Sequence, residues 1–134
     1  MNRETLEQYY GIASNIEAID WEITKLYNPV SSPQGRQGVR GSTPSSPTEA
    51  SAMRIIHLRE MVEAERARLY ALAEEIETWL TTCDDKEITA IVRWHYLLRL
   101  NWSRTNIKVY GYPDYDYSRK KIERYFNGKK RTDY

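Results

Sequence analysis

Cysteine is almost absent from this 134-residue chain, which contains only Cys83. A lone thiol cannot form an intrachain disulfide, and no group of cysteines and histidines has the spacing of metal ligands. We therefore expect a protein of a reducing compartment that holds neither a metal ion nor another cofactor.

Long apolar runs are also missing. No stretch approaches the ~20 apolar residues that a membrane-spanning helix needs. Residues 1–7 lack the basic and then apolar pattern of a signal peptide. We expect a cytoplasmic protein with no membrane partner.

Catalytic motifs are missing as well. There is no Gly-rich phosphate-binding motif, and the two histidines, His57 and His95, are isolated in the sequence. Glu74, Glu75 and Glu77 lie so close together on a predicted helix that their side chains point to different sides and form no acid/base pair. The sequence predicts no enzyme, and a neutral packed ring is the simplest interpretation of both histidines.

What the chain does have is an ordinary globular composition with an uneven distribution of charge. Apolar residues make up 40% and charged residues 29%, which excludes a wholly disordered chain. Up to Cys83 there are 8 Lys+Arg against 12 Asp+Glu, a net charge of −4, and after it 12 against 7, a net charge of +5. Residues 118–131 contain seven Lys or Arg residues and a single acidic residue, Glu123. This clustering predicts contact with nucleic-acid phosphate.

Two long helices are predicted in the first half of the chain. The first apolar seam, with 3-4 spacing, consists of Tyr9, Ile12, Ile16, Ile19, Ile23 and Leu26. The second, interrupted only by Glu65, consists of Ile55, Leu58, Val62, Leu69, Leu72, Ile76 and Trp79. Asn28-Pro29 ends the first helix, and Thr48 is an expected N-cap of the second. We expect an antiparallel, coiled-coil-like hairpin over 1–83 with a flexible Ser/Gly/Pro-rich loop at 29–47, and its free apolar edges suggest a homodimer.

Three shorter helices are predicted over residues 84–134. Asp84-Asp85 begins the first, because short carboxylates accept bonds from the free backbone N–H groups of a helix start. Ser103 is the expected N-cap of the second, which runs to Ile107 or Tyr110. The segment 111–114 is a turn before the third helix.

The last of these helices is the candidate site. Asp116 or Ser118 is its expected cap, its inward face consists of Ile122, Tyr125 and Phe126, and Asn127-Gly128 ends it. Ser118, Arg119 and Lys121 are placed to donate to base edges in the major groove of duplex DNA. Lys120, Arg124 and a basic tail of Lys129, Lys130 and Arg131 are suited to phosphates. The predicted fold is thus all-α, a helical hairpin followed by a three-helix helix-turn-helix.

Aromatic residues offer a second interpretation. Eleven tyrosines would suit stacking on single-stranded nucleic acid. Packing is favoured instead, because Tyr9, Tyr96 and Tyr125 lie on predicted core faces, while four more tyrosines gather in 110–117. Trp102 is likewise expected to pack between helices.

Four segments, 84–85, 91–93, 96–103 and 118–126, resemble the C-terminal part of small phage-encoded regulators of the RinA and ArpU type. Those late-gene activators have a helix-turn-helix like that of sigma factor region 4. The family pattern is an acidic cap, an apolar helix ending in an aromatic-Ile-Asp-Gly-Leu-Ser-Trp turn, a short helix, and a Ser/Thr-capped basic helix. The first half of the chain is similar too, since many members have a helix, a Ser/Gly/Pro-rich stretch and a long second helix.

This sequence departs from the family pattern at two places. Leu98-Arg99 replaces the Asp-Gly pair, and the segment 110–117 is longer, more aromatic and more acidic than the family's turn. The resemblance implies a phage or prophage transcriptional regulator that binds double-stranded DNA in the host cytoplasm.

Two other functions suit the same features. The acidic hairpin and the aromatic turn would suit an inhibitor of the anti-CRISPR kind, which docks on a host RNA polymerase, nuclease or other nucleic-acid enzyme. A small terminase subunit also combines DNA binding with helical oligomerisation.

Overall fold

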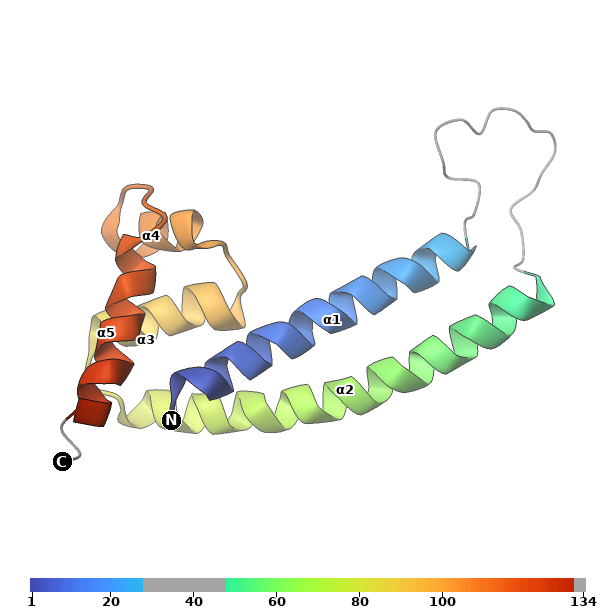
Figure 1. Cartoon of the computed structure of the whole chain (residues 1–134), viewed down its shortest axis with the longest axis horizontal. Coiled ribbons are helices and arrows are strands. Elements are labelled where there is room, and N and C mark those ends of the chain that lie inside the picture. The colour runs from blue at the N-terminus through green and yellow to red at the C-terminus, as the bar shows by residue number, and fades with distance from the viewer. Residues whose placement is uncertain (28–47, 132–134) are drawn as a thin grey trace. The chain divides into compact units, whose positions relative to one another are not determined.

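The computed structural model describes residues 1–27 and 48–131, and side chains to residue 128. Its elements are α1 (Arg3–Tyr27), α2 (Glu49–Thr82), α3 (Lys86–Ile91), the π-helical turn η3 (Val92–Leu97), α4 (Trp102–Tyr110) and α5 (Tyr117–Arg131). The long helices α1 and α2 pack antiparallel, and the short helices that follow pack together (Figure 1). The predicted all-α fold is confirmed, while the predicted loop 29–47 lies outside the described residues.

The chain divides into two compact units. One comprises Met1–Ile12 and Leu69–Tyr134, and the other Ala13–Arg68, so each long helix contributes to both. The expected boundary between Cys83 and Asp84 therefore does not coincide with this division. The reason is that the first turns of α1 and the last turns of α2 share a hydrophobic core with the short helices.

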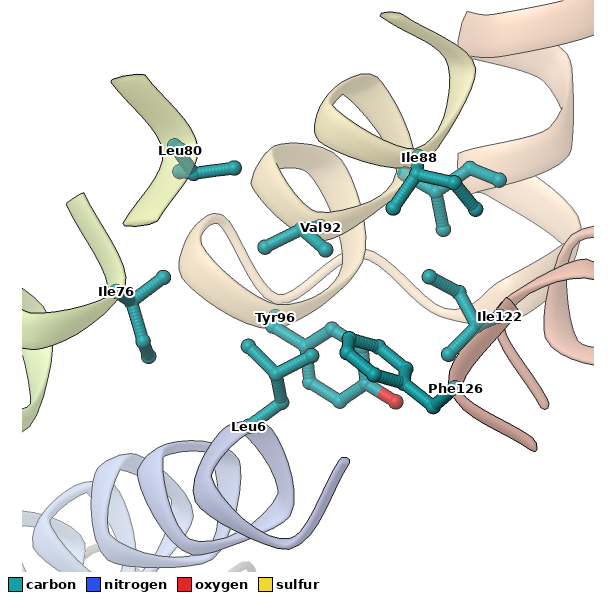
Figure 2. Packing of buried hydrophobic residues seen from close by; sticks show 9 residues of the cluster. Leu6, Ile76, Leu80, Ile88, Val92, Tyr96, Ile122 and Phe126 are labelled. Carbon is teal, nitrogen blue, oxygen red and sulfur yellow. The ribbon is translucent and has the colours of Figure 1, made fainter. Parts of the chain in front are cut away.

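The core of the first unit collects side chains from several helices, which converge as Figure 2 shows. Its buried members include Leu6, Ile76, Leu80, Ile88, Val92, Tyr96, Ile122 and Phe126. Each such side chain contributes on the order of 1.5–3 kcal/mol when it is removed from water. The predicted inward face of the last helix is confirmed, with Ile122 and Phe126 buried and Tyr125 half-buried. Burial of Leu6 was not predicted.

The second unit uses the predicted seams. Its buried residues are Ile16 and Ile19 of α1 and Ile55, Leu58 and Val62 of α2. Arg54 of α2 forms an ion pair of 2.9 Å with Glu22 of α1. Large apolar side chains remain exposed in this unit, among them Trp21, Met53 and Ile56.

Two predicted helix starts are confirmed. The hydroxyl of Thr48 accepts a hydrogen bond from the backbone N–H of Ser51 at 3.2 Å. Oδ1 of Asp85 accepts from the N–H groups of Glu87 and Ile88 at 3.1 and 3.2 Å. A polar side chain one residue before the helix satisfies donors that the first turn leaves free.

Two other predicted boundaries are wrong. Oδ1 of Asn101 accepts from Arg104 N–H at 2.8 Å, so Asn101 caps α4 and Ser103 lies inside its first turn. Asn127-Gly128 does not end α5, which continues to Arg131. Glycine ends a helix where it adopts a positive φ, and among the glycines of the described segments only Gly111, after α4, does so, at 93°. Within 1–27 and 48–131 no helix is both long and apolar enough to cross a membrane.

Candidate nucleic-acid interface

A buried polar bridge joins α4 to α5. The side chain of Asn106 donates through Nδ2 to the carbonyl of Tyr112 at 2.8 Å, and its Oδ1 accepts from the hydroxyl of Ser118 at 2.6 Å. Asn106 and Ser118 are both fully buried. The prediction that Ser118 contacts a base is therefore wrong, because its hydroxyl is consumed inside the protein.

The turn before α5 is organised by Asp114. Its Oδ1 accepts from the backbone N–H groups of Asp116 and Tyr117 at 2.8 and 3.0 Å. Asp116 lies directly before α5, at the predicted cap position. Its carboxylate, however, accepts a hydrogen bond from Arg119 and does not cap the backbone. Ser118 does not cap the helix either. The sequence signal for this role is an Asp within a turn, because an Asp side chain commonly accepts a hydrogen bond from the backbone N–H two residues later.

Arg119 is held by two carboxylates close to it in the sequence, one just before α5 and one within it. Its guanidinium lies 2.8 Å from Asp116 and 3.0 Å from Glu123. The hydrogen bond to Asp116 raises the pKa of Arg119, and the same contact lowers the pKa of Asp116. Two carboxylates therefore compete with any phosphate for this side chain.

Lys121 belongs to a junction of three helices. Oε1 of Glu87 on α3 lies 2.7 Å from Nζ of Lys121 on α5 and accepts from the hydroxyl of Tyr110 on α4 at 2.8 Å. The contact with Lys121 is the main reason why the pKa of Glu87 is lowered, and it raises the pKa of Lys121. Lys121 was predicted to contact a base edge, but in the structure its charge is already paired with Glu87.

Lys120 and Arg124 differ from their neighbours. Both are exposed, and within residues 1–27 and 48–128 neither has a hydrogen-bond or ion-pair partner. They lie four residues apart, so their side chains share one face of α5. This face is opposite the buried Ile122. Among the predicted residues whose side chains are described, Lys120 and Arg124 present free positive charge to solvent.

The last three predicted residues continue the helix. Lys129, Lys130 and Arg131 belong to α5, so the expected tail is helical in its backbone. Their side chains lie outside the described part of the structure.

Sequence reasoning overlooked cations on α4. Arg104 and Lys108 are exposed and four residues apart, while the intervening Thr105 and Asn106 are buried. Nζ of Lys108 lies 5.1 Å from the ring centroid of Trp94. The signal was present as i, i+4 spacing, but a search confined to residues 118–131 does not reach it.

The turn before α4 rests on a buried histidine. His95 stacks on Trp102 with ring centroids 3.5 Å apart, so the predicted packing role of Trp102 is confirmed. Nδ1 of His95 lies 2.7 Å from the carbonyl oxygen of Leu100, and burial lowers the pKa of His95. A neutral ring that donates from Nδ1 satisfies both observations. His57, in contrast, is exposed, so the expectation of a packed ring fails there.

Backbone strain is found in the same turn. Arg99 has φ 65°, the one positive φ of a non-glycine residue in the described chain. Its guanidinium lies 5.1 Å from the ring centroid of Tyr10. This left-handed conformation lets the chain reverse between η3 and α4.

The tyrosines divide into two groups. Tyr96 is fully buried and Tyr125 is half-buried, as the packing interpretation predicts. Burial raises the pKa of Tyr125 to about 12. Tyr112 and Tyr115, however, are exposed, so packing is the wrong interpretation for these two.

Comparisons of this chain with protein-family models, curated proteins and solved structures find no match. The function proposed below therefore depends on the residues of the interface themselves.

Proposed function

We propose that this protein is a phage or prophage transcriptional regulator that binds double-stranded DNA. In this proposal α4, the turn and α5 act as a helix-turn-helix of the sigma factor region 4 type, and α5 reads the major groove. The observation that carries the proposal is the exposed face of α5, where Lys120 and Arg124 have no partner in the described structure.

The charges on α5 are suited to phosphate rather than to protein carboxylates. Lys120 and Arg124 are four residues apart, which separates them by about 6 Å along the helix axis. Long cationic side chains reach phosphate oxygens without a fixed partner, and each neutralised phosphate releases counterions. The apolar back of the helix, with Ile122 and Phe126 buried, holds this face outward.

The turn before α4 supports the resemblance to the phage regulators. Arg99, with φ 65°, occupies the position of the family's glycine, and a left-handed φ is what glycine adopts at low cost. Asn101 occupies the position of the family's serine, and its side chain caps α4. A left-handed residue followed by a polar helix cap is compatible with the glycine and serine of the family pattern, although both residues differ.

Selection of bound fragments from random duplex DNA tests the proposal. We expect enrichment of a defined site, with affinity that falls steeply as salt rises. A purified protein that shows no preference among DNA sequences at moderate salt would contradict it.

A homodimer through the hairpin belongs to the same proposal. It is supported by Met53 and Ile56, which are 64% and 53% exposed and three residues apart on α2. A Met53→Glu, Ile56→Glu double variant should lower the solution mass from dimer to monomer. Trp21→Glu, at a 63% exposed site on α1, is the matched control and should leave the mass unchanged. A dimer that persists in the double variant but is lost in Trp21→Glu would exclude the face of Met53 and Ile56 as the dimer interface.

An inhibitor that docks on a host nucleic-acid enzyme is the second candidate. Exposed apolar side chains such as Trp21 and Tyr70 favour it, since protein partners cover such groups. Association with purified RNA polymerase or a purified nuclease that survives removal of DNA would support this function. A small terminase subunit would instead show a ring-sized mass.

A further inference from the structure

The turn 111–116 is less acidic toward solvent than its sequence suggests. Asp114 accepts two backbone N–H bonds, and Asp116 is paired with Arg119 at 2.8 Å. Both carboxylates are therefore engaged by the protein's own donors. What the turn and the first residue of α5 present to solvent are tyrosine rings, with Tyr112, Tyr115 and Tyr117 exposed by 47%, 64% and 38%.

One of these rings, that of Tyr117, continues the cationic face of α5. Tyr117, Lys120 and Arg124 have the spacing i, i+3, i+7, which places them on one side of the helix. Tyr117 is oriented by edge contact with Tyr110, at 4.9 Å between ring centroids. Tyr115 precedes it by two residues. We call Tyr112, Tyr115, Tyr117, Lys120 and Arg124 the tyrosine–cation surface.

We propose that the tyrosine–cation surface binds DNA that contains unpaired bases. An exposed aromatic ring gains most from a nucleic acid when a base stacks on it. Base faces inside a duplex are covered by their neighbours, so only unpaired or displaced bases offer a free face. Lys120 and Arg124 then hold phosphates near the stacked bases. The inference rests on the proposed function and specifies which form of DNA the site prefers.

Charge favours a nucleic acid over a protein as the occupant. The free charges at the end of this surface, Lys120 and Arg124, are both positive. Of the nearby carboxylates, Asp116 is paired with Arg119, and Asp114 accepts bonds from backbone N–H groups. A strand of DNA supplies regularly spaced phosphates together with flat bases, and so matches both halves of the surface.

Fluorescence anisotropy with labelled DNA tests the inference. The probes are a fully paired duplex and the same duplex with a short central bubble of mismatched thymines. Wild-type protein should bind the bubble at least about fivefold more tightly, and Tyr115→Ala should lower bubble affinity by roughly tenfold. Binding of the paired duplex should change little in that variant.

Two controls isolate the stacking contribution. Tyr115→Phe keeps the ring and should retain the bubble preference. Tyr70→Ala removes a 65% exposed tyrosine from α2 and should have no effect. Because Tyr115 has no ring or hydrogen-bond contact in the described structure, its replacement leaves the fold unchanged, which a thermal melt verifies.

Equal binding of both probes by the wild-type protein, or unchanged bubble binding in Tyr115→Ala, would overturn the inference. The proposed function would survive that result if the paired duplex were still bound through Lys120 and Arg124. Absence of salt-sensitive binding to either probe would instead contradict the proposed function itself. Loss of a purified protein partner in Tyr115→Ala, with DNA binding intact, would also overturn the inference.

Discussion

The hydroxyl of Ser118 donates a hydrogen bond across 2.6 Å to Oδ1 of Asn106, and both side chains are completely buried. Since Asn106 also donates to the carbonyl of Tyr112, one amide ties together α4, the turn and α5. The angle at which α5 presents Lys120 and Arg124 therefore depends on two polar residues that never reach the surface.

Replacing Ser118 by alanine should destabilise the fold. The change leaves Oδ1 of Asn106 buried without its donor, which costs about 1–3 kcal/mol in the free energy of unfolding. Denaturant titration measures this loss. Ser103→Ala is the control: Ser103 lies in the first turn of α4 without capping it, and its replacement should cost less than about 0.5 kcal/mol. Equal effects of the two changes would contradict the bridge.

Stability should fall as the pH is lowered through the titration of His95. Burial lowers the pKa of His95 in the folded protein below its ordinary value of 6.5. Above pH 6.5 the ring is neutral in both states and there is no effect. Below it the unfolded chain takes up the proton first, so the free energy of unfolding decreases until the pH passes the folded pKa.

The measurement for His95 is denaturant unfolding at pH 7.5, 6.5 and 5.5, in the wild type and in His95→Gln. The difference between the two proteins removes the contribution of the carboxylates. The variant should lose part of the pH dependence over this range. A wild type that gains stability relative to His95→Gln between pH 7.5 and 5.5 would contradict the neutral buried ring.

At position 99 a glycine variant should be more stable than an alanine variant. Both changes remove the guanidinium that lies over Tyr10, but only alanine keeps the strain of φ 65°. We expect the free energy of unfolding of Arg99→Gly to be about 0.5–1 kcal/mol higher than that of Arg99→Ala. At Leu98, where φ is −95°, the order should reverse. The same order at both positions would argue against strain at Arg99.

The sequence predicted the parts of the fold that local rules decide. The 3-4 spacing of Ile12, Ile16 and Ile19 places them on one helix face, and all three are buried. Asp85 could be identified as a cap because its side chain acts on backbone only two and three residues ahead. Such signals need no knowledge of the tertiary structure.

The candidate site was predictable only in part. Positive charge on the last helix is visible in sequence, but whether a cation is free depends on contacts from distant residues. Lys121 is held by Glu87, 34 positions earlier, and Ser118 is buried by Asn106 on another helix. Periodicity within α5 cannot distinguish Lys121 from Lys120, because the partner of Lys121, Glu87, lies on another helix.

The most direct test of this account is the salt dependence of DNA binding in two matched double variants. Both remove two positive charges from α5, Lys120→Ala with Arg124→Ala in one and Arg119→Ala with Lys121→Ala in the other. The slope of log Kobs against log salt should become shallower by about 2 in the first variant, since each lost phosphate contact changes it by roughly 0.9. In the second variant the slope should stay near that of the wild type, because Asp116, Glu123 and Glu87 already hold those cations. Equal slopes for the two variants, or a larger change in the second, would contradict the assignment of the DNA contact to Lys120 and Arg124.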